Sequence, residues 1–266
     1  MNDILEEILT YKREEVEQWK QYIPLKQLYG MMEYGKLDKI EQPSLQLALE
    51  KSNTGVIAEF KRKTPLHQWI NQGAKASKIP YEFQRGGAVA ISIPTDKPCF
   101  GGYDEYVQEA KATGVTIPIV YNNFIIDEYQ LFQARRVGAS AVVLNSSLLS
   151  IEQCHSLQSL AHQLGLEVVL EIHSVDKLDY LDLQPDVCAV DNRDLRTFEV
   201  DVNVSLELAR YLPDNILKIS EGGINSLSKI NLLKEEGYQG FVIGEYLMRQ
   251  ENPGVFLRNL ISELEK

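Results

Sequence analysis

The sequence predicts an α/β fold, a closed (β/α)₈ TIM barrel with an N-terminal helical extension, on three observations. Eight short apolar runs recur after Gly55, helix-like segments separate them, and glycines follow three of those segments. Most runs are continuously apolar, which is typical of parallel strands buried on both faces. The chain has 266 residues, which suits one barrel of about 250 residues and a short extension. An open doubly wound sheet is the structural alternative.

The apolar runs define the expected strands. They are Val56–Phe60, Ala88–Ile93, Ile117–Val120, Ala141–Leu144, Glu167–Ile172, Val187–Val190, Ile216–Ser220 and Gly240–Ile243. The expected helices include Tyr103–Thr113, Glu128–Val137, Ile151–Leu164, Ser174–Leu181, Ser205–Leu212 and Ser226–Glu236. Gly138, Gly165 and Gly237 stand just past three of these helices, where a left-handed glycine commonly ends a helix.

The N-terminal part has a different pattern. Residues 3–19 place apolar side chains at helical spacing among Glu and Lys, which predicts an amphipathic helix. A second short segment runs from Ser44 to Lys51, and residues 20–43 read as irregular. We therefore expect a helical extension over residues 1–52 and the barrel over residues 53–266, in a single domain overall.

Composition and charge exclude several classes of function. A net charge of -11 argues against a nucleic-acid surface, which needs clustered Lys and Arg, but allows a small phosphorylated ligand held by backbone N–H groups. No apolar run approaches the roughly 18 residues of a membrane span, and the acidic N-terminus lacks a signal-peptide core. Three cysteines without a C-x-x-C pair favour the reducing cytoplasm. The oligomeric state stays open, and a monomer is compatible with the sequence.

Ionisable residues gather at the expected carboxyl ends of the strands, where barrels of this kind carry their catalytic groups. Glu59 and Lys61 are two residues apart on the first strand and so share one face. They form either a buried ion pair that fixes local geometry or a functional pair that serves acid–base chemistry or anion binding. Later strand ends add Glu171, Asp191, Arg193 and Glu221. Clustered carboxylates raise one another's pKa and cations lower it, which is how acid–base pairs are tuned.

Glycines after the last two strands predict a phosphate site. Gly222 and Gly223 follow the seventh strand and Gly244 follows the eighth, the two loops that commonly hold phosphate in this fold. Glycine lets backbone N–H groups approach an anion closely. The side chain of Glu245 must then turn away from the anion. The alternative is that these glycines form two ordinary tight turns.

The four histidines show no metal-binding motif such as H-E-x-x-H. His155 and His162 are seven residues apart on a helix that we expect to lie away from the mouth. His67 falls in the loop after the first strand. His173 follows Glu171, and we expect it to support that carboxylate or to pack beside it.

These residues resemble the indole-3-glycerol phosphate synthase family of the tryptophan pathway, from about Ser44 to the C-terminus. The matching segments are Ile57-Ala-Glu-Phe-Lys-Arg-Lys-Thr-Pro65, Thr95-Asp96 with Phe100-Gly101-Gly102, Phe124-Ile-Ile-Asp-Glu-Tyr-Gln130, Leu170-Glu-Ile-His173, Asn192-Arg-Asp-Leu195 with Thr197-Phe198, Ser220-Glu221 with Gly223-Ile224, and Ile243-Gly244 with Leu247-Met248-Arg249. The N-terminal helix also resembles the family segment that covers part of the barrel mouth.

The resemblance implies a substrate, 1-(2-carboxyphenylamino)-1-deoxyribulose 5-phosphate, and no cofactor or metal. The family closes a ring onto the carbonyl carbon, loses CO₂ and then loses water. The implied roles are dehydration and charge stabilisation for Glu59 and Glu171, dehydration and carboxylate contact for Lys61, ordering of the sugar hydroxyls for Arg193 and Glu221, phosphate binding for Thr64, Gly223 and Gly244, and walls for the aromatic ring for Phe100 and Phe124.

The departures from the family pattern fall at strand ends. The family has a catalytic Lys after the third strand, the general acid for ring closure, where this chain has Asn122. An amide donates a hydrogen bond but delivers no proton. Asp191 replaces a family Asn and adds negative charge, and further departures lie at Leu66, Gln68, Pro94 and Gly222.

Three hypotheses follow from the sequence. The first is a synthase of this family in which Lys61 or a water replaces the missing acid. The second is a divergent lyase or isomerase that acts on a related sugar phosphate. The third is a non-catalytic paralogue that binds a phosphorylated ligand or a partner protein.

Overall fold

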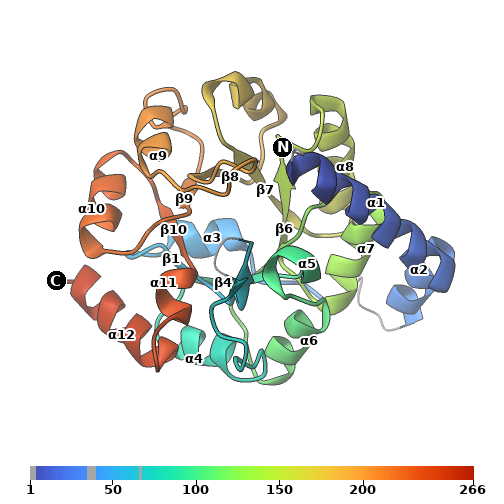
Figure 1. The fold of residues 1–266 in the computed structure, drawn as a ribbon, viewed down its shortest axis with the longest axis horizontal. Helices are drawn as coiled ribbons and strands as arrows, with labels where there is room; N and C mark the ends of the chain where they lie inside the picture. Colours follow the sequence, from blue (N-terminus) through green and yellow to red (C-terminus); the bar gives the residue numbers. More distant parts are fainter. Residues whose placement is uncertain (1–3, 35–39, 66–67) are drawn as a thin grey trace.

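The computed structural model describes residues 4–34, 40–65 and 68–266. Eight parallel strands form a closed barrel in the order β1-β10-β9-β8-β7-β6-β5-β4 (Figure 1). They are β1 (Val56–Glu59), β4 (Ala90–Pro94), β5 (Ile119–Asn122), β6 (Ala141–Asn145), β7 (Glu167–Ile172), β8 (Val187–Asp191), β9 (Lys218–Glu221) and β10 (Gly240–Ile243). Strand β1 pairs with both β4 and β10, so the predicted TIM barrel is confirmed and the open sheet is excluded.

Helices surround this barrel on its outside (Figure 1). They are α4 (Ile79–Arg85), α6 (Glu105–Ala112), α7 (Glu128–Val137), α8 (Ile151–Gln163), α9 (Asn203–Leu208), α10 (Leu227–Glu235) and α12 (Pro253–Leu264). The short helices α5 (Lys97–Phe100) and α11 (Glu245–Met248) follow β4 and β10 and lie inside this ring. The segment predicted as a helix from Ser174 is a 3₁₀ helix, η2 (Val175–Leu183). Gly138, Gly165 and Gly237 have positive φ angles just past α7, α8 and α10, as predicted.

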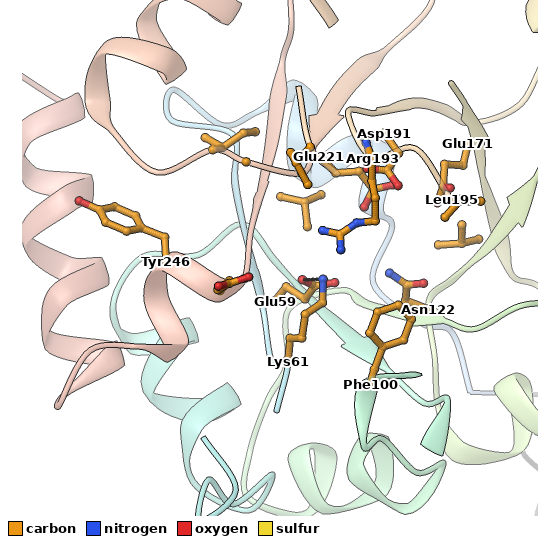
Figure 2. Close-up of a pocket in the computed structure, with 18 of the residues that line it drawn as sticks. Glu59, Lys61, Phe100, Asn122, Glu171, Asp191, Arg193, Leu195, Glu221 and Tyr246 are labelled. Atoms are coloured by element: carbon orange, nitrogen blue, oxygen red, sulfur yellow. Dashed lines mark hydrogen bonds and ion pairs between the residues drawn. The ribbon is translucent and has the colours of Figure 1, made fainter. Parts of the chain in front are cut away.

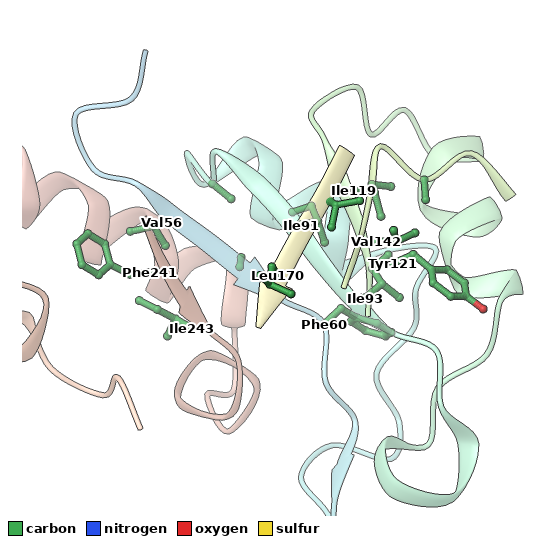
Figure 3. Close-up of a cluster of buried hydrophobic side chains, with 14 of the residues drawn as sticks. Val56, Phe60, Ile91, Ile93, Ile119, Tyr121, Val142, Leu170, Phe241 and Ile243 are labelled. Atoms are coloured by element: carbon green, nitrogen blue, oxygen red, sulfur yellow. The ribbon is translucent and has the colours of Figure 1, made fainter. Parts of the chain in front are cut away.

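The strands alternate between two apolar layers because successive side chains point to opposite faces. Val56 and Phe241 belong to the layer between strands and helices (Figure 3), whereas Ile57 and Val242 point into the barrel. Inside, the short helix α3 (Leu45–Glu50) contributes Leu45 and other apolar side chains, which fill one end of the barrel. That end is a packed core, so the opposite end is the one available for chemistry.

The N-terminal extension forms two helices, α1 (Ile4–Tyr22) and α2 (Leu25–Tyr34). The first confirms the predicted amphipathic helix. The second is a correction, because residues 20–43 were read as irregular. Its sequence contains a central Gly30, which disfavours a helix, but Leu28 and Met32 pack against Phe132 of α7. Tertiary burial, rather than local propensity, stabilises this helix.

A buried ion pair fixes α1 to the barrel. Lys12 and Asp96 are fully buried, with 2.7 Å between Nζ and Oδ2, and the Tyr11 hydroxyl donates to the same carboxylate. Ile8 packs with Phe124 beside the mouth. The first helix therefore covers part of the mouth, as the resemblance implied.

Candidate active site

The period of two along each strand decides which side chains reach the mouth. Ile57, Val169 and Ile219 point into the barrel, so the residues two positions further on also point inward, at its open end. Applied to six strands, this rule gives Glu59, Asn122, Asn145, Glu171, Asp191 and Glu221. The barrel interior is therefore apolar at one end and polar at the other.

These side chains line a cavity of about 330 Å³ (Figure 2). The structure brings nearly all the predicted site residues to it: Glu59, Lys61, Phe100, Asn122, Phe124, Glu171, Asp191, Arg193, Glu221, Gly222, Gly223, Gly244 and Glu245. Thr64 is the exception. It is buried in the two-stranded hairpin of β2 (Lys63–Thr64) and β3 (Gln68–Trp69) and is absent from the cavity lining. Leu66 and His67 lie outside the described residues.

One side of the mouth holds a neutral ion pair against an aromatic wall. The Nζ atom of Lys61 lies 2.6 Å from Oε2 of Glu59, and both side chains are buried. The same ammonium lies 5.2 Å from the centre of the Phe100 ring, and the Phe100 and Phe124 rings are 5.8 Å apart. A cation beside two rings suits a ligand that carries a carboxylate on an aromatic ring.

The opposite side of the mouth begins with a hydrogen-bonded triplet. The Nε2 atom of His173 lies 3.0 Å from Oε1 of Glu171, and the amide of Asn145 contacts both groups. Burial lowers the pKa of His173, but the hydrogen bond and charge of Glu171 outweigh burial and raise the pKa to about 9. Burial in turn raises the pKa of Glu171, and its bond to His173 brings the pKa below the usual value. The expected supporting role of His173 is thus consistent with its contacts.

Two further carboxylates crowd this side. Asp191 and Glu221 are register partners on β8 and β9. Burial and the charge of Glu171 raise the pKa of Asp191 to about 6. Burial, together with Glu171, Asp191 and Glu59, raises the pKa of Glu221 well above its usual value. The pKa values of Asp191 and Glu221 are therefore higher than those of isolated carboxyl groups.

Two side chains in the cavity are available to a ligand. The guanidinium of Arg193 extends into the cavity toward Glu59 and Lys61 (Figure 2) and forms no side-chain hydrogen bond within the described part of the chain. The side-chain amide of Asn122 likewise has no hydrogen bond to any residue that the structure describes. Arg193 can bind an anion, whereas the side chain of Asn122 offers a neutral hydrogen-bond donor.

The predicted phosphate loops have tight packing of their own. Gly222 has a φ of 85°, and a Cβ there would lie 2.9 Å from Oδ1 of Asp191. A Cβ on Gly244 would overlap the carboxylate of Glu59. Glu245 pairs with Arg249, with 2.6 Å between Oε1 and Nη2. Close approach to carboxylates explains two of the glycines, and phosphate binding at this loop stays a prediction.

Sequence reasoning missed Asn145, which hydrogen-bonds the central carboxylate, and also Tyr246 and Arg249, which line the cavity. The signal for Asn145 was present, because it follows Leu144 directly at the end of an expected strand. Tyr246 and Arg249 lie on α11 and just past its last residue, and no strand pattern points to them.

The closed barrel and its mouth define an acid–base enzyme of the (β/α)₈ class. Residues 5–260 match the family model described as indole-3-glycerol phosphate synthase. A protein of that name from Bacteroides thetaiotaomicron is 42% identical over 265 residues, covering 100% of both chains. Another, from Carboxydothermus hydrogenoformans, is 34% identical over 97% of this chain and 99% of its own. The chain belongs to the indole-3-glycerol phosphate synthase family.

Solved structures support the fold alone. The tryptophan synthase alpha subunit of Legionella pneumophila superposes with a TM-score of 0.60 at 13% identity, over 82% of this chain and 98% of its own. A thiamine phosphate pyrophosphorylase from Pyrococcus furiosus gives a TM-score of 0.58 at 15% identity, over 80% and 96%. Among the described helices, none combines the length and the apolar character that crossing a membrane requires.

Proposed function

We propose that this chain is a carbon–carbon lyase that converts 1-(2-carboxyphenylamino)-1-deoxyribulose 5-phosphate into indole-3-glycerol phosphate. Family membership over nearly the whole chain supports this reaction. The observation that carries the proposal is the buried Glu59–Lys61 pair against the aromatic wall of Phe100 and Phe124. This arrangement matches a substrate whose carboxylate is attached to an aromatic ring.

Each step of the reaction needs a group that the mouth supplies. The ring carbon that bears the carboxylate attacks the ketone carbon, and the ketone oxygen takes a proton. The carboxylate then leaves as CO₂, and its electron pair restores the aromatic ring. Loss of the new hydroxyl group as water, with a proton from the adjacent carbon, gives the indole. Glu59, Lys61 and Glu171 are our candidates for these proton transfers.

The first proton transfer is the weak step in this chain. Asn122 can stabilise the developing oxyanion only by a neutral hydrogen bond. Lys61, already bonded to Glu59, or a water must then deliver the proton. We therefore propose a slow enzyme, since a positioned general acid contributes about 10²–10⁴ in rate.

The remaining contacts concern the sugar phosphate. We propose that Arg193 and Glu221 order the sugar hydroxyls and that Gly223 and Gly244 approach the phosphate, with Lys229 close behind Gly223. Thr64 would contribute to phosphate binding only indirectly, by holding the hairpin of β2 and β3 in place, because its side chain is buried there. Free Cys99, Cys154 and Cys188 support a reducing, cytoplasmic location for the protein, which we propose acts as a monomer.

The second candidate function is a lyase or isomerase for a related sugar phosphate, or a non-catalytic binding protein. The amide of Asn122 at the mouth and the added carboxylate of Asp191 favour it. Incubation with the family substrate, followed by mass spectrometry, separates the candidates. Formation of a product lighter by CO₂ and water supports the synthase reaction. Unchanged substrate, with inorganic phosphate bound near Gly223 in a soaked crystal, supports the second candidate.

A further inference from the structure

The carboxylate of Asp96 joins the N-terminal helix to a wall of the mouth. Its Oδ2 atom lies 2.7 Å from Nζ of Lys12 and 3.0 Å from the hydroxyl oxygen of Tyr11, and both partners belong to α1. Its Oδ1 atom accepts a hydrogen bond from the backbone N–H of Cys99, at 2.7 Å, and so caps the first turn of α5. The two oxygens of one carboxylate therefore hold two different helices.

Helix α5 depends on Asp96 for its position. It has four residues, and a single turn of helix is not stable by itself in water. The backbone carbonyl of Asp96 also accepts hydrogen bonds from the N–H groups of Phe100 and Gly102, at 3.2 and 3.0 Å. The conformation of Asp96 therefore determines where Phe100 lies.

Phe100, the last residue of α5, lines the cavity at the mouth (Figure 2). Its ring centre lies 5.2 Å from Nζ of Lys61 and 5.8 Å from the ring centre of Phe124. Ile8 of α1 belongs to the same apolar cluster as both rings. A displacement of α5 would therefore change the aromatic wall and the surroundings of the Lys61 ammonium together.

The contact between Lys12 and Asp96 is unusual in its burial, because both side chains are 0% exposed. A second carboxylate, that of Glu15, lies 2.6 Å from Nζ of Lys12 but is partly exposed. A buried ion pair is weak evidence for stability, since apolar residues in its place are often as stable or more stable. Orientation of the carboxylate that caps α5 gives this pair a different use.

Another lysine of α1 makes a similar contact without the same consequence. The Nζ atom of Lys20 lies 2.8 Å from Oδ2 of Asp127, which caps α7. Both side chains are partly exposed, so water can replace the contact at little cost. Helix α7 has ten residues and a complete capping box with Gln130, and bonds of its own therefore hold it.

We propose that Lys12 and Asp96 are positioning residues for Phe100, so that α1 sets the affinity of the mouth for the aromatic ring of the substrate. The identity of that ring rests on the proposed function. The inference goes beyond a helix that covers the mouth, because α1 fixes one wall of the ring site through a single carboxylate.

Fluorescence titration with 2-aminobenzoate, an aromatic ring that bears a carboxylate, tests the inference. Lys12→Met leaves a buried carboxylate without its cation, so Asp96 should turn toward water or take up a proton and loosen its hold on α5. The affinity should fall about two- to tenfold, the value of one aromatic contact. Tyr11→Phe removes one hydrogen bond from the same oxygen and should have a smaller effect in the same direction.

Lys20→Met is the matched control, because it makes the same substitution on the same helix and removes the exposed contact. Its affinity for 2-aminobenzoate should equal that of the parent. Thermal unfolding of each variant checks that it is folded, and Tyr11→Phe serves in all the tests if Lys12→Met does not fold.

A Phe100→Ala background separates positioning from a general loosening of the protein. If Lys12 acts through Phe100, Lys12→Met should cause no further loss of affinity once the ring is absent. Equal losses in both backgrounds would overturn the proposal, and so would unchanged affinity in folded Lys12→Met.

A crystal structure of Lys12→Met provides a readout that needs no ligand. The Phe100 ring should leave its place beside Phe124, and a ring that stays 5.8 Å from Phe124 would overturn the inference. Failure of the parent to bind 2-aminobenzoate would count against the proposed function instead, and the crystal structure would still decide the role of Lys12.

Discussion

The two sides of the barrel mouth solve the problem of buried charge differently. On the β1 side, Glu59 and Lys61 neutralise each other at 2.6 Å. On the β7–β9 side, Glu171, Asp191 and Glu221 lie together, and burial and mutual repulsion raise the pKa of both Asp191 and Glu221. Glu59 and Lys61 belong to a segment that resembles the family, whereas Asp191 and Asn122, which line the same cavity, stand where the resemblance implies Asn and Lys. We therefore expect chemistry of the family type to depend on how far these two positions alter the mouth.

The largest expected effect comes from restoring the altered positions. Asn122→Lys combined with Asp191→Asn should raise indole-3-glycerol phosphate formation by about 10²–10⁴, the contribution of a positioned general acid. The lysine supplies the proton, and the asparagine removes a carboxylate that opposes the developing oxyanion. Steady-state fluorescence of the indole product measures the change. Each single variant is needed as well, because neighbouring substitutions couple.

A folded double variant that binds phosphate but forms no product would contradict this expectation. The departures at Leu66, Pro94 and Gly222 would then have adapted the cavity to another substrate. The second candidate function would replace the first.

Stability should distinguish the two sides next. Glu59→Gln leaves a buried ammonium without its carboxylate and should lower the free energy of unfolding by about 3 kcal/mol. Glu221→Gln should cost less, because it removes a carboxylate that burial and the charges of Glu171, Asp191 and Glu59 disfavour. Urea unfolding of both variants tests the difference. Equal losses would mean that the two sides are energetically alike.

A smaller effect is expected on ligand binding when the Glu59–Lys61 pair is changed. Lys61→Met removes the ammonium beside Phe100. It should reduce the binding free energy of a carboxylate-bearing ligand by about 1.5–3 kcal/mol, the value of a hydrogen bond to a charged group. Calorimetry with a 2-carboxyphenylamino compound provides the measurement. Unchanged affinity would assign Lys61 a structural role as the partner of Glu59.

The smallest expected effect is a pH dependence of stability from Asp104, a buried carboxyl group outside the cluster of mouth carboxylates. Asp104 accepts a hydrogen bond from the Tyr121 hydroxyl at 2.7 Å, and burial raises the pKa of Asp104 to about 6. The folded protein then holds this proton more tightly than the unfolded chain, so stability should fall as the pH rises from about 4 to about 6. Urea unfolding across this range should show a shallower fall for Asp104→Asn. An identical pH profile would show that Asp104 titrates normally.

Much of this account was predictable from the sequence because barrel strands obey a simple period. The apolar runs predicted all eight strands, and the strand ends predicted Glu59, Glu171, Asp191 and Glu221. The third strand was placed two residues early, since Ile117 is apolar but β5 begins at Ile119 and continues through Asn122. Pattern alone shows that a strand is present more clearly than where it begins and ends.

The rest depended on contacts between distant parts of the chain. Helix α2 forms because Leu28 and Met32 pack on α7, and the helical spacing of Leu25, Leu28 and Met32 was overlooked in the sequence. The bond of Asn145 to Glu171 depends on the pairing of β6 with β7, which makes the two residues register partners. Thr64 matches a family motif, yet the hairpin of β2 and β3 buries it. Sequence motifs therefore identify candidate residues, whereas the fold determines which of their side chains are in contact.

The most direct test of the central claim is the turnover rate of the unmodified protein with the family substrate. The claim is that this barrel performs the family reaction although Asn122 stands at the end of β5, where the resemblance implies a lysine as general acid. Stopped-flow fluorescence should then show authentic indole-3-glycerol phosphate forming more slowly than the usual enzyme range of about 1–10³ per second. A rate inside that range would show that another group delivers the proton fully. No product at all from folded protein would contradict the proposed reaction.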